Sequence, residues 1–226
     1  MDAFKVKEKA LMLGADICGI GGEERFTGAP KGFHPLDVLQ SCKSAVIFGI
    51  RFNASMMNAK STTPYTVARN TIGQELNLIA TKLALYIADQ GYDAVPLASL
   101  GAEAYIEEEG KLHGLISLKH AAVLAGLGKM GRNTLLVNER YGNLLWLGGV
   151  LTSAELEADP IAPYEPCSAN CGLCASSCPA GALRDHAIDQ KVCMQYASGA
   201  RNGGEWKIHC FECRKVCPNS QGMKRE

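Results

Sequence analysis

Apolar side chains recur along the first two thirds of the chain with periods that predict helices and strands in turn. Residues 2–13 are predicted as a helix that ends at Gly14, and residues 117–125 as a shorter helix. Between them, an apolar stripe at intervals of three and four residues predicts a long helix that ends at Gly91. The stripe consists of Ile72, Leu76, Ile79, Ala80, Leu83 and Ile87.

Continuous apolar runs predict four strands, at residues 16–20, 45–50, 93–97 and 144–151. The run at 45–50 contains no polar side chain, which is typical of a central strand covered on both faces. Cys18 and Cys42 lie in or beside these runs without a partner at metal-ligand spacing, so we interpret both as core residues. Because helices alternate with strands up to residue 158, we expect a layered α/β (α+β) domain there.

A proline-rich stretch follows this domain. Asp159-Pro160, Pro163 and Pro166 predict a stiff, extended linker, so we expect two domains, residues 1–158 and residues 159–226. Lysine plus arginine equals aspartate plus glutamate at 23 each, so no net charge draws the protein to nucleic acid or to an anionic membrane. No apolar run reaches the roughly 18 residues of a membrane span, and no secretory signal is recognisable. We therefore expect a cytoplasmic protein with reduced thiols.

The second domain carries eight of the ten cysteines, in two runs that each end in Cys-Pro. In two-cluster bacterial ferredoxins, three closely spaced cysteines hold one 4Fe-4S cluster, and the cysteine before proline crosses to the other cluster. This pattern predicts two 4Fe-4S clusters in a ferredoxin-like domain. The ligands of one are Cys167, Cys171, Cys174 and Cys217, and those of the other are Cys178, Cys193, Cys210 and Cys213.

The cysteine spacing departs from the ferredoxin pattern at two places. Three residues separate Cys167 from Cys171, and sixteen separate Cys193 from Cys210. The alternative is a structural zinc held by the two Cys-x-x-Cys pairs, which would leave four thiols unexplained. Disulfides fit less well, since a cytosolic chain keeps its thiols reduced.

Polar side chains between the predicted strands are the candidates for acid catalysis. The residues able to donate protons to a substrate are Tyr105, His113, Lys119 and His120, each of which also has a structural interpretation. The glycines of residues 126–131 match the pattern of dinucleotide-binding turns. Such a turn joins a strand to a following helix, whereas here a predicted helix comes first. We therefore reject a dinucleotide site.

Several stretches together resemble the epoxyqueuosine reductases and their relatives, the cobalamin-dependent reductive dehalogenases. The stretches are residues 14–20, residues 29–35 (Ala-Pro-Lys-Gly-Phe-His-Pro), residues 119–122, residues 125–133, Tyr141-Gly142, Leu147-Gly148 and the spread second cysteine run. The resemblance implies a cobalamin bound base-off in the α/β domain beside one cluster, with Gly126, Gly128 and Gly131 as cofactor contacts. The Asp-x-His-x-x-Gly motif that supplies a histidine to cobalt is absent, in agreement with base-off binding.

Two departures from this family bear on the substrate. Epoxyqueuosine reductases carry an aspartate ahead of an Ala-Pro step that resembles a proton donor, but residues 112–118 here contain no acid. They also extend past the clusters into a helical repeat domain that helps hold tRNA, whereas this chain stops at Glu226. Reduction of a tRNA base is therefore not expected, and nucleic acid is not an expected partner.

Three hypotheses follow. The first is a cobalamin- and 4Fe-4S-dependent oxidoreductase that works anaerobically on a small molecule, with electrons from a low-potential donor of the ferredoxin or flavodoxin type. The second is an electron-transfer protein that serves a redox partner protein and performs no catalysis. The third is queuosine modification of tRNA. The long α/β domain favours the first, because a carrier alone needs only the cysteine region.

Overall fold

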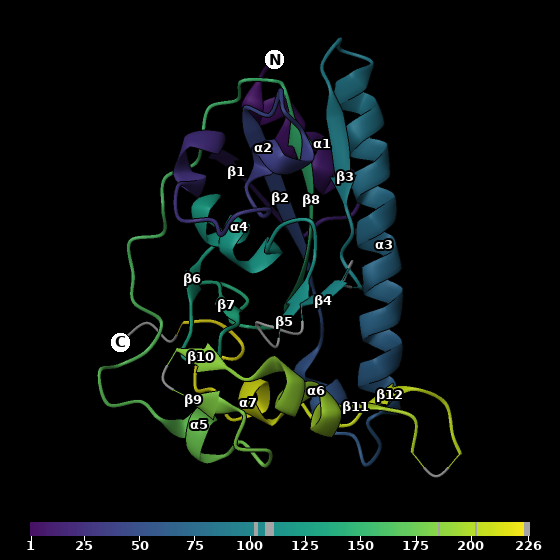
Figure 1. Cartoon of the computed structure of the whole chain (residues 1–226), viewed down its shortest axis with the longest axis vertical. Coiled ribbons are helices and arrows are strands. Elements are labelled where there is room, and N and C mark those ends of the chain that lie inside the picture. Colours follow the sequence, from purple (N-terminus) through teal and green to yellow (C-terminus); the bar gives the residue numbers. More distant parts are fainter. Residues whose placement is uncertain (102–103, 107–110, 185, 202, 224–226) are drawn as a thin grey trace.

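A four-stranded antiparallel sheet in the order β1-β2-β8-β3 lies at the centre of the computed structural model (Figure 1). The structure describes residues 1–101, 104–106, 111–184, 186–201 and 203–223, with the side chains of 104–106 and 111–112 outside the description. The strands of the sheet are β1 (Ile17–Gly22), β2 (Ser44–Arg51), β3 (Ala94–Leu97) and β8 (Leu145–Thr152). All four predicted strands are confirmed, and their antiparallel pairing makes the mixed α/β fold an α+β arrangement.

Strand β2 is the central strand that its apolar run predicted. It pairs with β1 on one side and with β8 on the other, and seven of its eight residues are buried. Gly148 and Gly149 of β8 lie opposite Phe48 and Ile47. A Cβ at Gly148 would lie 2.8 Å from the Phe48 ring, so glycine here allows the aromatic side chain to pack against the sheet.

Helices cover both faces of the sheet. Helices α1 (Ala3–Met12) and α3 (Thr63–Ala88) pack on one face, and α4 (Leu118–Leu124) packs on the other. Every residue of the predicted apolar stripe on α3 is buried, which confirms the helical period. The helix begins nine residues before that stripe, at Thr63, and its first turns bury Tyr65 and Ala68 near the cysteine region.

Short elements connect these layers. They are η1 (Glu23–Phe26), α2 (Pro35–Val38), η2 (Ala54–Met57), β4 (Ala104–Ile106), β5 (Lys111–His113), β6 (Lys129–Met130) and β7 (Leu136–Val137). Strands β4 and β5 pair in a stretch for which the sequence pattern predicted no element. Within the described part of the chain, no helix combines the length and the apolar character that a membrane crossing demands.

The cysteine region follows β8 and gathers at the N-terminal end of α3 (Figure 1). Residues 153–166 contain no helix or strand. This agrees with the extended segment that the prolines of residues 159–166 predicted. The chain then forms α5 (Leu173–Ser176), β9 (Leu183–Arg184), β10 (Ala187–Ile188), α6 (Gln190–Ala197), β11 (Ser198–Gly199), β12 (Lys207–Ile208) and α7 (Glu212–Lys215). The ring of Phe211 packs against Tyr65 with 4.5 Å between centroids, which joins this region to α3.

Replacement of Leu76 by alanine tests the core of the α3 face. Leu76 is fully buried, so Leu76→Ala should lower the free energy of unfolding by about 2–5 kcal/mol through lost burial and a cavity. The control is Leu78→Ala on the same helix, because Leu78 is 59% exposed and its loss should cost no more than about 0.5 kcal/mol. Urea titration of both variants measures the difference, and equal losses would contradict the described packing.

Candidate functional site

Two short helices repeat one local arrangement of cysteines. Helices α5 and α7 lie against each other. In each, one cysteine precedes the helix, one lies within it and one follows it directly before a proline. These cysteines are Cys171, Cys174 and Cys178 around α5, and Cys210, Cys213 and Cys217 around α7. The repeat brings two sets of thiols together at the contact between the helices.

Cys167, Cys171, Cys174 and Cys217 form what we call the first thiol group. Burial raises the pKa of the Cys217 thiol, and the backbone amide of Asn219 lowers it. The thiols of the other three members raise it again. Because a nearby thiolate disfavours a further negative charge, this effect indicates that the four sulfurs lie close together.

Cys178, Cys193, Cys210 and Cys213 form the second thiol group. Burial raises the pKa of the Cys213 thiol to about 11, and the thiols of the other three members contribute to the increase. Cys193 reaches the group from α6, which is capped by the Asp189 carboxylate at 3.0 Å from the amide of Val192. The electrostatic couplings among the thiols therefore fall within the two predicted sets, while the ligand assignment and iron binding stay predictions.

Backbone amides surround the thiols that precede or follow these helices. Burial raises the pKa of the Cys178 thiol, but the amide hydrogen bonds of residues 180–183 outweigh it and hold that pKa below its ordinary value. The amide of Arg132 lies 3.5 Å from the Cys167 Sγ. Donors of this kind stabilise a thiolate and tune the potential of a cluster bound to it.

Two adjacent polar residues link the loops of both groups. The Arg132 guanidinium donates to the carbonyls of Ala169 at 2.7 Å and Cys171 at 3.1 Å, and so holds the loop with the extra residue after Cys167. The Asn133 side-chain amide donates to the carbonyl of Cys213 at 3.1 Å. The sequence pattern could not predict either contact, because each joins residues more than thirty positions apart in the chain.

Zinc and a 4Fe-4S cluster make different demands on the thiol groups. Among the described residues, no three His, Cys, Asp or Glu side chains are placed to hold one metal ion. A tetrahedral zinc would need four sulfurs at roughly 2.3 Å from a common centre. A 4Fe-4S cluster instead binds each thiolate at a separate iron corner.

The remaining cysteines are core residues, as their positions in apolar runs predicted. Cys42 is 2% exposed among the residues between the sheet and α4, and burial raises the pKa of its thiol to about 11. Cys18 packs against the core on the α1 and α3 side, where burial raises its pKa to about 12. Neither thiol shares the electrostatic environment of the two groups.

The three glycines that the resemblance assigned to a cofactor pack closely against other residues of this chain. Gly126 has φ +74°, and a Cβ there would lie 2.3 Å from the carbonyl oxygen of Pro160. A Cβ at Gly128 would lie 2.4 Å from the carbonyl of Val137, and one at Gly131 would lie 2.8 Å from Asn133 Oδ1. Packing within the chain therefore requires glycine at Gly126 and Gly128, and corrinoid contact stays a prediction. Helix α4 precedes the glycines, which supports rejection of a dinucleotide turn.

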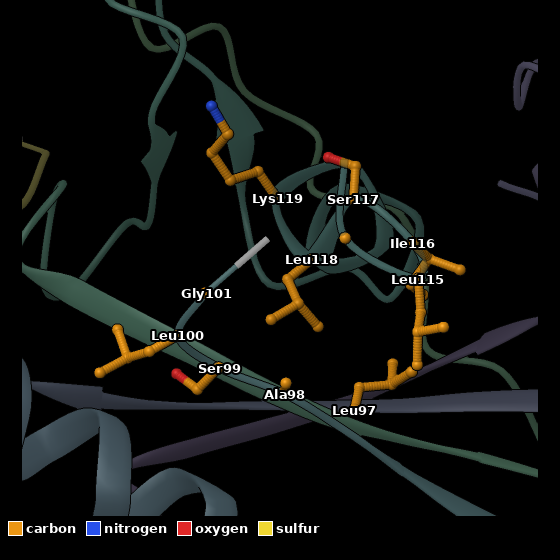
Figure 2. Close-up of a pocket in the computed structure, with 11 residues that line it drawn as sticks. Leu97, Ala98, Ser99, Leu100, Gly101, Leu115, Ile116, Ser117, Leu118 and Lys119 are labelled. Carbon is orange, nitrogen blue, oxygen red and sulfur yellow. The ribbon is translucent and has the colours of Figure 1, made fainter. Parts of the chain in front are cut away.

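A cavity of about 300 Å³ lies between the end of β3 and the start of α4 (Figure 2). Residues Leu97–Gly101 and Gly114–Lys119 line it. Its walls are mainly aliphatic, with the hydroxyls of Ser99 and Ser117 among them. The volume is at the lower limit of small-molecule pockets, roughly 300–1,000 Å³, so it has room for a small substrate. A corrinoid fills several times this volume and does not fit the cavity formed by the described residues.

Lys119 lies between this cavity and the second thiol group. Its Nζ donates to the carbonyl of Thr134 at 2.6 Å, and Figure 2 shows its side chain extending away from the aliphatic lining. Burial and then Arg214 lower its pKa, while the thiols of Cys213 and Cys193 raise it. Thr134 has φ +58°, a conformation that is rare for a β-branched residue and turns its carbonyl toward the lysine.

The other candidate acids have different surroundings. His120 Nδ1 lies 2.7 Å from Ser117 Oγ at the exposed start of α4, and burial and then Lys119 lower its pKa. The His113 ring lies against Phe33, with 3.6 Å between centroids. Tyr105 belongs to β4, and its side chain lies outside the described residues. Among the described side chains, Lys119 is the candidate whose pKa responds to the thiols of the second group.

Comparison with known proteins supports the predicted resemblance. An epoxyqueuosine reductase of Gloeobacter violaceus is 27% identical over 230 residues, which cover 93% of this chain and 67% of that relative. The structure of the epoxyqueuosine reductase from Streptococcus thermophilus aligns with a TM-score of 0.70 at 17% identity, over 99% of this chain and 67% of that one.

A reductive dehalogenase whose structure suggests a mechanism for B12-dependent dehalogenation aligns with a TM-score of 0.69 at 21% identity, over 94% of this chain and 31% of that one. No family model matches. The resemblance to epoxyqueuosine reductases and reductive dehalogenases is therefore confirmed, and the chain spans about two thirds of the length of the epoxyqueuosine reductases.

Substitution of Gly126 tests whether the glycine segment is fixed by packing. Gly126→Ala should lower the free energy of unfolding by about 1–3 kcal/mol, because a Cβ meets the Pro160 carbonyl and φ is positive. The matched control is Gly28→Ala, where a Cβ meets nothing within 4 Å. Denaturant titration of the protein without added cofactor makes the comparison, and equal stability of the two variants would contradict the packing.

Proposed function

We propose that this chain, a relative of the epoxyqueuosine reductases, is an iron–sulfur reductase that holds one 4Fe-4S cluster in each thiol group and reduces a small molecule at the cavity. The observation that carries the proposal is the separation of eight thiols into two sets of four, the second of which couples to Lys119 at the cavity rim. Low-potential one-electron transfer is the chemistry that such clusters supply when bound. The cysteine region then serves as the electron entry, with a donor of the ferredoxin or flavodoxin type.

The residues around the cavity have defined parts in this proposal. The aliphatic walls exclude water, which strengthens electrostatic interactions inside. Lys119 holds a positive charge between the cavity and the second thiol group, and burial that lowers its pKa makes its proton easier to release. A substrate that gains electrons becomes more basic, so this ammonium is the proton donor that we assign.

Cobalamin is a separate proposal. A relative by fold is described in terms of B12-dependent dehalogenation, and the sequence resemblance implies the same cofactor. The cavity of about 300 Å³ does not accommodate a corrinoid, so no step assigned to Lys119 or to the thiol groups depends on one. Binding of a corrinoid would need a larger opening between β3 and α4.

The second candidate function is an electron-transfer protein that reduces a redox partner protein. It is favoured by the small size of the cavity, which does not accommodate a corrinoid. In that case Lys119 and the cavity are structural, and the thiol groups alone carry the activity. Queuosine modification of tRNA is the third candidate, supported by the name that the curated relatives share.

An anaerobic titration of the reconstituted protein with cobalamin separates these functions. Two clusters require about eight irons per chain. A base-off cob(II)alamin spectrum by electron paramagnetic resonance at one equivalent would support a corrinoid reductase. Full iron content without a corrinoid response would support the carrier or a corrinoid-independent reductase. A salt-sensitive gel shift with tRNA would support the third function, and iron well below eight would overturn the two-cluster proposal.

Removal of single thiols tests the assignment of ligands. Cys213→Ala should lower the iron content from about eight to about four per chain, because one cluster loses a ligand from the second thiol group. Cys174→Ala should do the same through the first group. Cys42→Ala is the control, because this buried thiol belongs to neither group and its variant should keep full iron content. Unchanged iron in Cys213→Ala and in Cys174→Ala would contradict the assignment.

A further inference from the structure

A buried arginine follows one cysteine of the second thiol group directly. Arg214 is 8% exposed and lies in α7 next to Cys213. Its Nη1 has no hydrogen-bond partner in the described structure. The ion pairs found among the described residues involve other cations, and none joins a carboxylate to Arg214.

Aromatic rings surround this guanidinium. Its Cζ lies 5.1 Å from the centroid of Phe52 and 5.4 Å from that of Trp146. The faces of aromatic rings attract a cation, but they carry no net charge. A buried charge without an ionic partner is strongly unfavourable, so a negative group is expected within reach of Arg214.

The second thiol group is the candidate for this negative group, because Cys213 directly precedes Arg214. Both residues lie in α7, so the backbone of Arg214 lies beside that of a member of the second thiol group. A 4Fe-4S cluster held by four thiolates carries a net negative charge, which increases by one on reduction. A cation beside it favours the reduced state, and burial limits the screening of this interaction by water.

On the premise that both clusters of the proposed function form, we propose that Arg214 is the counter-cation of the second thiol group. With Lys119, it raises the reduction potential of the cluster held there above that of the cluster in the first thiol group. Glu212 acts in the opposite sense on Cys210 but is a single, half-buried carboxylate. The electron therefore rests on the cluster that lies nearer the cavity.

The first thiol group has a cation of a different kind. The half-buried Arg132 guanidinium contacts the loop after Cys167 through a part-buried hydrogen bond to the Cys171 carbonyl and an exposed one to the Ala169 carbonyl. Water and salt screen a half-buried charge more than a buried one, so we expect its effect on a cluster to be smaller than that of Arg214. Arg132 thus provides a matched control for Arg214 within the same protein.

A redox titration of the anaerobically reconstituted full chain tests the proposal. The reduced clusters are followed by electron paramagnetic resonance, and Cys213→Ala and Cys174→Ala identify which signal belongs to which group. In the parent protein the second cluster should be reduced at the higher potential. Arg214→Met should shift the second cluster to lower potential and leave the first nearly unchanged. Arg214→Lys should retain the parent potential, and Arg132→Met should shift the first cluster by less.

The outcomes separate this inference from the proposed function. Iron well below eight per chain in the parent protein overturns the clusters themselves. Full iron with equal potentials in the parent and Arg214→Met overturns the inference alone. Loss of the second cluster in Arg214→Met but not in Arg214→Lys supports a required positive charge. Loss of the second cluster in both variants would assign Arg214 a packing role and overturn the inference.

Discussion

Mutual repulsion among closely placed thiolates is the constraint on which the arrangement of the cysteine region depends. Two sets of four sulfurs lie within about fifty residues that contribute few buried apolar side chains, and α6 buries none. A segment of this kind cannot gain enough free energy from burial to hold its own shape. Its stability must come from the α/β part against which it packs and, in the proposed function, from the clusters that bind the thiols.

The α/β part supplies this support at specific positions. The first turns of α3 extend beyond its aliphatic stripe so that Tyr65 meets Phe211 and Thr66 accepts a hydrogen bond from the amide of Ile208 at 3.0 Å. The segment after the glycines contributes Arg132 and Asn133 to the loops of both thiol groups. The arrangement of the thiols and the folding of the chain therefore depend on the same contacts, because the residues that fix the thiols also join the two parts of the chain.

Local periodicity predicted the helices and strands well, and the two predicted sets of cysteines agree with the electrostatic coupling among their thiols, including that of Cys193. Both predictions rest on neighbours in sequence or on the needs of a known metal group. The insertion of β8 between β2 and β3 was not predictable, because strand order depends on contacts across a hundred residues. The contacts of Arg132 and the burial of Arg214 were missed for the same reason, since a charged residue carries no sign in the sequence of its burial or of its partner.

The linker bears on how electrons enter the protein. The Asp159 carboxylate accepts hydrogen bonds from Lys7 Nζ at 2.6 Å and from the amide of Ile20 at 2.9 Å. Further along, the Tyr164 hydroxyl donates to the carbonyl of Val137 at 2.8 Å. A tether held at both points cannot swing the cysteine region between a donor and an acceptor. The distance from the thiols to the cavity is then a fixed property of the fold, and in the proposed function it is the external donor that must travel.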